Sequence, residues 1–323
     1  MRIVVYGGGA IGGALGAKRF ASGGDVVLIA RGAHYRALSN DGLRLVAPSS
    51  TETLAVPVVD DPGAIDWRDD DVVCLCMKSQ DSTDALARLL ETAGPDVPVC
   101  CVQNGVENER LAARLFSRVY GGYIQCPATH LEPGVIETHS EPVTGIIDVG
   151  RWPQGCDETA VAIAAELEAS TFSSLARDDI MRWKYAKLLV NLTNALEVLC
   201  GSGARRGAVA ALLRREAETC LHAAGIAFAS AADERERRGD LVAYRQPVPG
   251  RAGGSSTWQS VRRGVGRIEA DYLNGEIVLL GAQLGIPTPA NEHIRRLANE
   301  LARTHGEPAT MSVDALLAEL SAR

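Results

Sequence analysis

The chain has 323 residues and a mass of 34.2 kDa, a length typical of about two domains. Its composition, 46% hydrophobic and 23% charged, excludes a wholly disordered, collagen-like or coiled-coil protein. The formal net charge of −7 provides no overall attraction to nucleic acid or to an anionic membrane surface.

The cysteines and histidines show neither metal-ligand spacing nor a disulfide framework. The eight cysteines lack paired CxxC or Cys/His spacing, and the six histidines are scattered along the chain, so we expect no bound metal. The apolar run before Gly7 is too short for a signal peptide, and no run reaches the roughly 18 apolar residues of a spanning helix. We therefore expect a cytoplasmic protein with no membrane or nucleic-acid partner.

Strands and helices alternate over the first half of the chain. Apolar periodicity predicts strands over 2–6, 26–30, 72–77 and 97–102, with helices over 10–21, 81–91 and 157–169. Short β-like pieces broken by proline and glycine over 120–149 predict hairpins that close the sheet. The alternation indicates a parallel sheet with helices packed against it.

The second half is mainly helical. Its periodicity predicts helices over 180–199, 208–224, 256–284 and 290–303. The stretch 233–249, which contains the run DERERRGD, predicts a mobile connection whose charges face solvent. These patterns predict one domain over 1–177 and an all-α domain over 178–323.

A glycine-rich turn joins the first predicted strand to the first predicted helix. Gly7, Gly9 and Gly12 satisfy GxGxxG, with Ala10 and Ile11 between the last two glycines. In this position the glycines permit a tight turn, a close approach to a pyrophosphate and close packing of helix on strand, and the helix N-terminus offers N–H groups. We favour an α/β, Rossmann-type dinucleotide-binding domain over the alternative, a glycine-rich turn without a ligand.

The second predicted strand ends in Arg31. A protein that binds NAD would place an acidic residue there for the ribose 2′-hydroxyl, whereas a guanidinium can donate several hydrogen bonds to a 2′-phosphate. Arg31 therefore favours NADP(H). The alternative is an ordinary surface arginine on a loop.

Lys187, Asn191 and Asn194 share one face of a predicted helix that is otherwise apolar. Burial of such groups is costly without polar partners. A buried amine whose pKa is lowered toward neutrality is a proton donor, and the amides could hold a polar substrate beside it. The alternatives are a lysine whose ammonium reaches solvent, with exposed asparagines, or a role for Lys184 instead.

Three further segments carry candidate residues. Lys78 and Asn104 follow two apolar strands, where α/β sheets bind ligands, although Asn-Gly is also a common turn pair. Glu269 and Asp271 lie in a helical stretch, where such acids are most often solvated or paired. The run 255–257, SST, could cap a helix or donate to a carboxylate.

The chain resembles the ketopantoate reductase (2-dehydropantoate 2-reductase) family in the order of its motifs. These are the glycine motif, Arg31, the lysine and the Asn-Gly pair after later strands, the KxxxN helix and the ExDYxNG segment. The resemblance covers most of the chain. It implies a Rossmann-type domain, an all-α C-terminal domain and an active cleft between them. It also implies reduction of the 2-oxo acid ketopantoate to pantoate with NADPH, in pantothenate and coenzyme A biosynthesis, and it is compatible with a homodimer.

The resemblance assigns catalytic and cofactor-binding roles to individual residues. It implies that Lys187 polarises and protonates the keto oxygen, and that Glu269 hydrogen-bonds the substrate and helps to set the state of the lysine. It implies that Asn104 lies beside the nicotinamide and the keto group, and that Lys78 lies on the cofactor side.

The same resemblance assigns substrate-binding roles. Asn191 matches an asparagine that binds the substrate hydroxyl, and Asn194 is the second amide of that helix. Ser256 matches the serine that holds the substrate carboxylate, with Ser255 and Thr257 as alternatives.

Three departures from the family pattern leave room for other functions. Asn194 lies at i+7 from the lysine where i+8 is expected, a further asparagine is missing after Leu199, and Trp258 stands in the serine loop. They favour, as the alternative, a paralogous reductase of another 2-oxo acid. A non-catalytic NADP(H)-binding sensor is a third hypothesis, which the presence of the catalytic candidates weakens.

Overall fold

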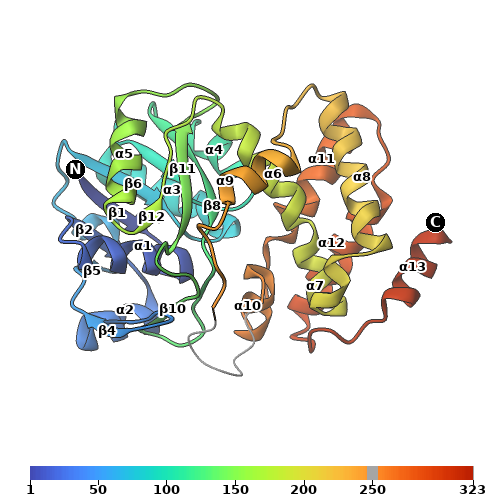
Figure 1. Ribbon diagram of the computed structural model, residues 1–323, viewed down its shortest axis with the longest axis horizontal. Coiled ribbons are helices and arrows are strands. Elements are labelled where there is room, and N and C mark those ends of the chain that lie inside the picture. The colour runs from blue at the N-terminus through green and yellow to red at the C-terminus, as the bar shows by residue number, and fades with distance from the viewer. Residues whose placement is uncertain (246–253, 323) are drawn as a thin grey trace. The chain divides into compact units, whose positions relative to one another are not determined.

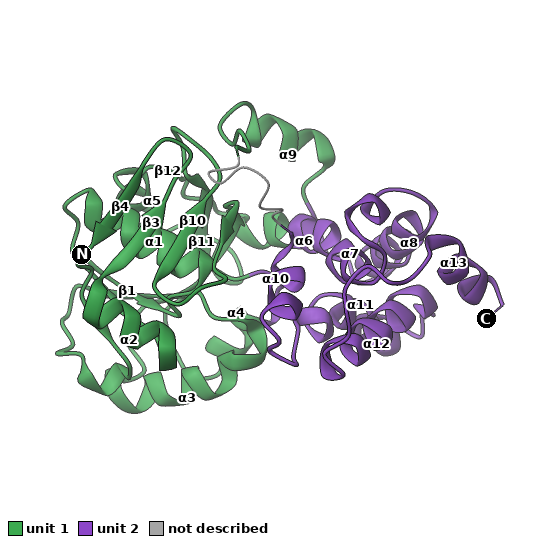
Figure 2. Cartoon of the chain, turned by 90° about the horizontal axis from the view of Figure 1, so that it is seen from below, with its two compact units in different colours: residues 1–103, 108–184, 229–251 green, residues 104–107, 185–228, 252–323 purple. Residues whose placement is uncertain are grey.

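The computed structural model describes residues 1–245 and 254–322, and the chain forms two compact units (Figure 2). Unit 1 comprises residues 1–103, 108–184 and 229–251, and unit 2 comprises residues 104–107, 185–228 and 252–323. Unit 1 is the α/β unit and unit 2 is helical. The predicted fold class is therefore confirmed.

Unit 1 is built on an eight-stranded sheet (Figure 1). Its strands are β1 (Arg2–Tyr6), β2 (Val26–Ile29), β5 (Val58–Val59), β6 (Asp71–Leu75), β7 (Val99–Cys101), β8 (Val119–Gln125), β11 (Gly145–Arg151) and β12 (Phe172–Ser173). They are ordered β12-β11-β8-β7-β6-β1-β2-β5, and all neighbours are parallel except β8 and β11.

Helices cover both faces of this sheet, and this explains its apolar strands. Along β1, Ile3 and Val5 face a core shared with α1 (Ala10–Ala21) and α5 (Glu158–Glu168). Val4 and Tyr6 face a second core shared with α3 (Ser82–Ala93) and α4 (Glu107–Ala112). Strands buried on both faces are continuous apolar runs in sequence, so the central strands β1, β2, β6 and β7 were predictable. The short strands β5 and β12 and helix α4 were not predicted.

A second sheet corrects one prediction. Strands β3 (Leu43–Val46), β4 (Thr51–Leu54), β9 (Ala128–Thr129) and β10 (Val135–Thr138) form a separate four-stranded sheet in the order β4-β3-β10-β9. The interpretation of 120–149 as hairpins that close the main sheet holds for β8 and β11, which pair antiparallel in that sheet, and was wrong for β9 and β10, which belong to the second sheet. Helix α2 (Gly32–Asp41) precedes β3.

Unit 2 contains most of α6 (Ile180–Asn191), which begins in unit 1. Its further helices are α7 (Thr193–Cys200), α8 (Ala208–Ala223), α10 (Ser256–Arg262), α11 (Asn274–Leu284), α12 (Pro289–Arg303) and α13 (Val313–Ser321). Two predicted helices are interrupted. The one over 180–199 breaks at Leu192, and the one over 256–284 ends at Arg262, shortly before Gly264 adopts a φ of +64°.

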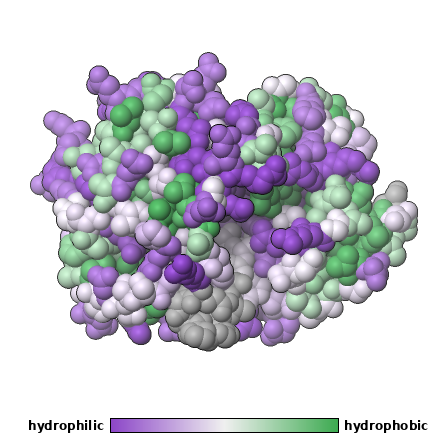
Figure 3. Space-filling view, viewed as in Figure 1, coloured by the Kyte–Doolittle hydropathy of each residue, from purple (hydrophilic) through white to green (hydrophobic). Residues whose placement is uncertain are grey.

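Helix α9 (Ala231–Arg238) lies in the stretch predicted to be a mobile connection. A capping box between Ser230 and Asp233 begins it, and hydrophilic residues cover the surface over it (Figure 3). The prediction that its charges face solvent was wrong for Arg237, whose side chain is 7% exposed and forms an ion pair with Asp148. The remainder, 246–249, lies outside the described residues.

Two kinds of feature are absent from residues 1–245 and 254–322. No helix there is both long and apolar enough to span a membrane. No three metal-ligating side chains gather at one place in these ranges.

Candidate active site

The turn between β1 and α1 requires its glycines. Gly7 has a φ of +107°, and a Cβ there would lie 2.6 Å from the backbone N of Met77. A Cβ at Gly12 would lie 2.1 Å from the Gly7 carbonyl oxygen, which is far inside contact distance. At Gly9 a Cβ would meet no heavy atom of the described chain within 4 Å, so this side of the turn is open to a ligand.

The first turn of α1 carries Ala10 and Ile11 and no acidic residue, and Gly9 caps it without a side chain. An open glycine turn at a helix N-terminus without carboxylates suits an anion such as a pyrophosphate.

Arg31 stands at the N-cap of α2 and is exposed. Its Nη2 donates to the Tyr6 hydroxyl oxygen at 3.0 Å, and its guanidinium carbon lies 5.9 Å from the centroid of the tyrosine ring. Burial raises the pKa of Tyr6, an effect that the charge of Arg31 opposes, so Tyr6 remains a neutral hydroxyl that can orient the guanidinium.

His34, on α2, contacts the glycine turn and was not among the candidate residues predicted from the sequence. Gly134 N–H donates to His34 Nδ1 at 2.9 Å, and Nε2 lies 2.7 Å from the Gly8 carbonyl oxygen. Since Nδ1 accepts, Nε2 carries the proton and donates to Gly8. His34 thus holds the glycine turn in place.

The carboxyl ends of β6 and β7 are tied together by buried polar side chains. Gln103 Nε2 donates to the Met77 carbonyl oxygen and to Ser82 Oγ, each at 2.9 Å. Asn108 accepts from Ser82 Oγ at 2.8 Å and donates to Ser79 Oγ at 3.0 Å. These contacts fix the loops that carry Lys78 and Asn104, and the signal for them was a run of polar residues after an apolar strand.

Within unit 2, the structure brings together Asn104 and Asn191. Asn191 Nδ2 donates to Asn104 Oδ1 at 2.9 Å. Asn191 and Asn194 are 4% and 3% exposed, so the alternative of exposed asparagines is wrong. Lys187, on α6 with Asn191, is half-buried. Lys184 is 2% exposed and forms an ion pair with Glu109.

The break at Leu192 separates Asn191 on α6 from Asn194 on α7. Asn274 Nδ2 donates to the Leu192 carbonyl oxygen at 3.1 Å and to Asn291 Oδ1 at 3.0 Å. A side chain that bonds a carbonyl in this way is a common cause of helix interruption. The asparagine of the ExDYxNG segment thus supports the segment that carries both candidate amides.

Replacing Asn274 by leucine is expected to lower the free energy of unfolding by about 1–3 kcal/mol, because two buried acceptors lose their donor. Urea denaturation followed by circular dichroism measures this. The control is Asn299→Leu, which removes an exposed contact with Asp271 and should change the free energy by at most about 0.5 kcal/mol. Equal losses for the two variants would contradict the role of Asn274.

The two carboxylates of the ExDYxNG segment differ in environment. Glu269 begins a short 3-10 helix, η4 (Glu269–Asp271), and is 3% exposed. Asp271 is a surface group that accepts from Arg295 Nη1 at 2.7 Å and from Asn299 Nδ2 at 2.8 Å. The structure therefore favours Glu269 as the candidate site residue.

The serine run begins α10. Ser255 is its N-cap and accepts from the Trp258 N–H at 3.3 Å, and Ser256 is its first residue. Thr257 is 1% exposed, and its Oγ1 has no hydrogen-bond partner in the part of the chain that the structure describes. The structure thus commits Ser255 to capping and leaves Ser256 and Thr257 as candidates for the substrate carboxylate.

Comparison with known proteins identifies the family. Residues 3–154 match the family model described as "Ketopantoate reductase PanE/ApbA", and residues 179–302 match "Ketopantoate reductase PanE/ApbA C terminal". The chain belongs to the ketopantoate reductase family.

Relatives within the ketopantoate reductase family include curated and structurally solved proteins. A 2-dehydropantoate 2-reductase from Mesorhizobium japonicum is 29% identical over 95% of this chain and 99% of that protein. One from Pyrococcus horikoshii is 31% identical over 59% of this chain and 61% of that protein. The crystal structure of a PanE/ApbA family ketopantoate reductase from Ralstonia eutropha JMP134 superposes with a TM-score of 0.79, at 28% identity, over 94% of this chain and 99% of that one.

Proposed function

We propose that this member of the ketopantoate reductase family reduces ketopantoate to pantoate with NADPH, a step of pantothenate and coenzyme A biosynthesis. The observation that carries the proposal is the pair of Asn104 and Asn191, hydrogen-bonded at 2.9 Å, beside Lys187 on the same helix. Amides held in this way can orient a small polar substrate against a proton donor. Full-length relatives that are named 2-dehydropantoate 2-reductase support the choice of substrate.

The residues of unit 1 fit a dinucleotide. The open side of Gly9 and the N–H groups at the start of α1 suit a pyrophosphate, and Arg31 suits a 2′-phosphate. Lys78, at the carboxyl end of β6, adds a positive charge. When bound, the reduced nicotinamide supplies a hydride to the keto carbon of the substrate.

The residues of unit 2 perform the accompanying proton transfer. Lys187 donates a proton from its ammonium group to the keto oxygen, so that one proton and one hydride convert the carbonyl to a secondary alcohol. Asn104 and Asn191 orient the keto and hydroxyl groups, and Ser256 or Thr257 donates to the carboxylate. Glu269, buried at the start of η4, accepts a hydrogen bond from the substrate hydroxyl and influences the protonation of the lysine.

Replacing Arg31 by alanine is expected to weaken NADPH binding by about 10- to 100-fold, the value of a charge-assisted hydrogen bond, and to leave NADH binding unchanged. Fluorescence titration with both cofactors measures this. Arg36→Ala, on the exposed side of α2, is the control and should affect neither. Equal losses of NADPH and NADH affinity in Arg31→Ala would remove the assignment of the 2′-phosphate contact.

A second candidate function keeps the fold and changes the substrate. It rests on Trp258, which is half-buried one residue after Thr257 and adds aromatic bulk to the segment proposed to hold the carboxylate, and on the break between Asn191 and Asn194. Initial rates of NADPH oxidation with ketopantoate and with branched and aromatic 2-oxo acids separate the two candidates. A higher kcat/KM for ketopantoate supports the first, and a higher value for another acid supports the second.

A further inference from the structure

Lys184 is a buried lysine that the proposed reaction does not use. Its side chain is 2% exposed, and its ammonium donates to the carbonyl oxygens of Cys101 at 3.2 Å and Gln103 at 2.9 Å. Its third partner is the carboxylate of Glu109, which is 0% exposed. An ammonium group has three N–H donors, so all three are engaged inside unit 1.

Gly121, which has no side chain, leaves space for the ion pair of Lys184 and Glu109. Gly121 lies on β8 beside Cys101 of β7, and a Cβ there would lie 3.3 Å from Lys184 Cδ and 3.4 Å from Glu109 Oε1. Burial raises the pKa of Glu109, and the charge of Lys184 opposes this effect. The pair persists because each charge compensates the desolvation of the other.

The partners of Lys184 lie on both sides of one short turn. Cys101 and Gln103 precede residues 104–107, and Glu109 follows them. The carbonyl that Lys184 holds at Gln103 belongs to the same planar peptide unit as the N–H of Asn104. Holding that carbonyl fixes the peptide plane that contains the Cα atom of Asn104, to which its side chain is attached.

We propose that the buried pair of Lys184 and Glu109 is a positioning device that holds the turn carrying Asn104 in the geometry needed for hydride transfer. The proposal rests on the proposed function, in which Asn104 lies beside the nicotinamide and the keto group. Lys184 touches neither and acts through Asn104.

The small net contribution of buried ion pairs to protein stability agrees with a positioning role. Replacing such a pair by apolar residues of similar volume is often neutral or stabilising, so stability alone does not account for its presence. Here the pair lies at the carboxyl end of a parallel strand, where α/β sheets bind ligands, and its hydrogen bonds go to the backbone of the loop that follows the strand.

The test is a mutant cycle on kcat and KM. Its four proteins are the wild type, the paired replacement Lys184→Met with Glu109→Leu, Asn104→Ala, and the combination of all three changes. The paired replacement removes both charges together and leaves neither one unpaired. Urea denaturation of each protein establishes that it is folded.

The expected result is that the paired replacement lowers kcat by about 10- to 100-fold, the cost of a misplaced active-site group, with the urea midpoint unchanged. In the Asn104→Ala background the same replacement should change kcat by less than about 2-fold, because residues that act as a unit are not additive. An unchanged kcat in the paired replacement, or losses that multiply in the combined variant, would overturn the proposal.

If the paired replacement does not fold, a more conservative variant, Gly121→Ala, tests the positioning role. Gly121→Ala keeps both charges and displaces the pair by a few tenths of an ångström. It should lower kcat only when Asn104 is present, and an equal loss in both backgrounds contradicts the proposal.

Failure of the proposed function is distinguishable from failure of this inference. If the wild type does not reduce ketopantoate, the proposed substrate is wrong, and the same cycle is measured on NADPH affinity by fluorescence. The positioning role then predicts weaker binding in the paired replacement and no further weakening in the Asn104→Ala background. Unchanged or multiplying effects on affinity contradict it.

Discussion

Replacing Lys187 by alanine is expected to lower kcat for ketopantoate reduction by about 10²- to 10⁴-fold, the usual contribution of a general acid. NADPH affinity should remain unchanged, because Lys187 is not one of the groups proposed to hold the dinucleotide, of which the glycine turn, the start of α1, Lys78 and Arg31 lie in unit 1. Steady-state rates of NADPH oxidation and fluorescence titration measure the two quantities.

Lys18→Ala is the matched control for this variant. Lys18 is a partly buried lysine of helix α1, so its loss reports the effect of removing a helical lysine away from the proposed chemistry. Its kcat should stay within about 2-fold of the wild type, as for a substitution away from special features. Tight NADPH binding with no change of turnover in Lys187→Ala would instead favour the non-catalytic sensor.

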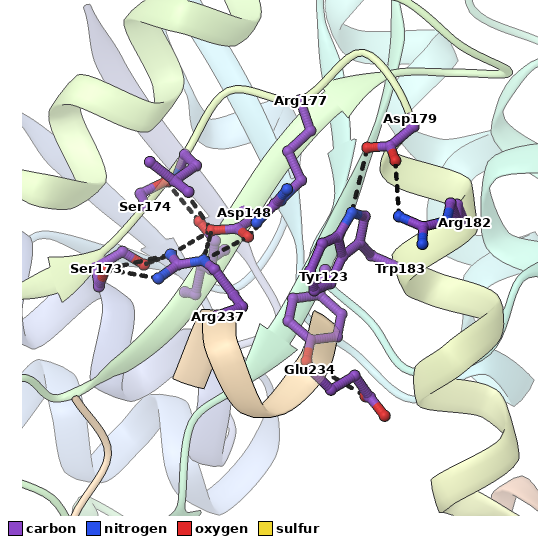
Figure 4. A network of polar contacts seen from close by, with 12 residues as sticks. Tyr123, Asp148, Ser173, Ser174, Arg177, Asp179, Arg182, Trp183, Glu234 and Arg237 are labelled. Atoms are coloured by element: carbon purple, nitrogen blue, oxygen red, sulfur yellow. Dashed lines mark hydrogen bonds and ion pairs between the residues drawn. The ribbon is translucent and has the colours of Figure 1, made fainter. Parts of the chain in front are cut away.

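Asp148→Asn is expected to lower the free energy of unfolding by about 3–5 kcal/mol, since it leaves two largely buried guanidinium groups without a counter-charge. Asp148 is 0% exposed and accepts from Arg177 Nε at 2.6 Å and from Arg237 Nη2 at 2.5 Å (Figure 4). These arginines come from the segment after β12 and from helix α9, so the aspartate joins three parts of unit 1. Urea denaturation measures the change.

The control for Asp148→Asn is Glu300→Gln, which removes the exposed partner of Arg303 on α12. An exposed pair of this kind contributes at most about 1 kcal/mol. A loss for Asp148→Asn as small as that for Glu300→Gln would show that the buried network does not stabilise the protein.

The main sheet was predictable because each central strand is buried on both faces and is therefore a continuous apolar run. Partners distant in sequence were not predictable. Arg237 lies in a charged run that is typical of a solvated helix, and only the position of Asp148, 89 residues away, makes it a buried group. Nothing in the local pattern of Arg237 distinguishes it from a surface charge, although Asp148 stands within an apolar strand.

In the candidate site, too, contacts between residues distant in sequence could not be predicted. Spacing placed Lys187 and Asn191 on one helix face and put the competing Lys184 off that alignment. It could not predict the partner of Lys184, because Glu109 comes from α4. The Leu192 carbonyl oxygen, at the break, accepts a hydrogen bond from Asn274, which is 82 residues away and so could not be identified from the local pattern. The functions assigned to individual residues, the homodimer and the cytoplasmic location stay predictions.

The measurement that tests the central claim most directly is the transfer of deuterium. The purified protein is incubated with ketopantoate and NADPH that carries deuterium at both positions of nicotinamide C4, and the product is examined by NMR. The account predicts pantoate with one deuterium at C2, formed in proportion to the cofactor oxidised. Oxidation of NADPH without deuterated pantoate, or no oxidation with this acid, would contradict it.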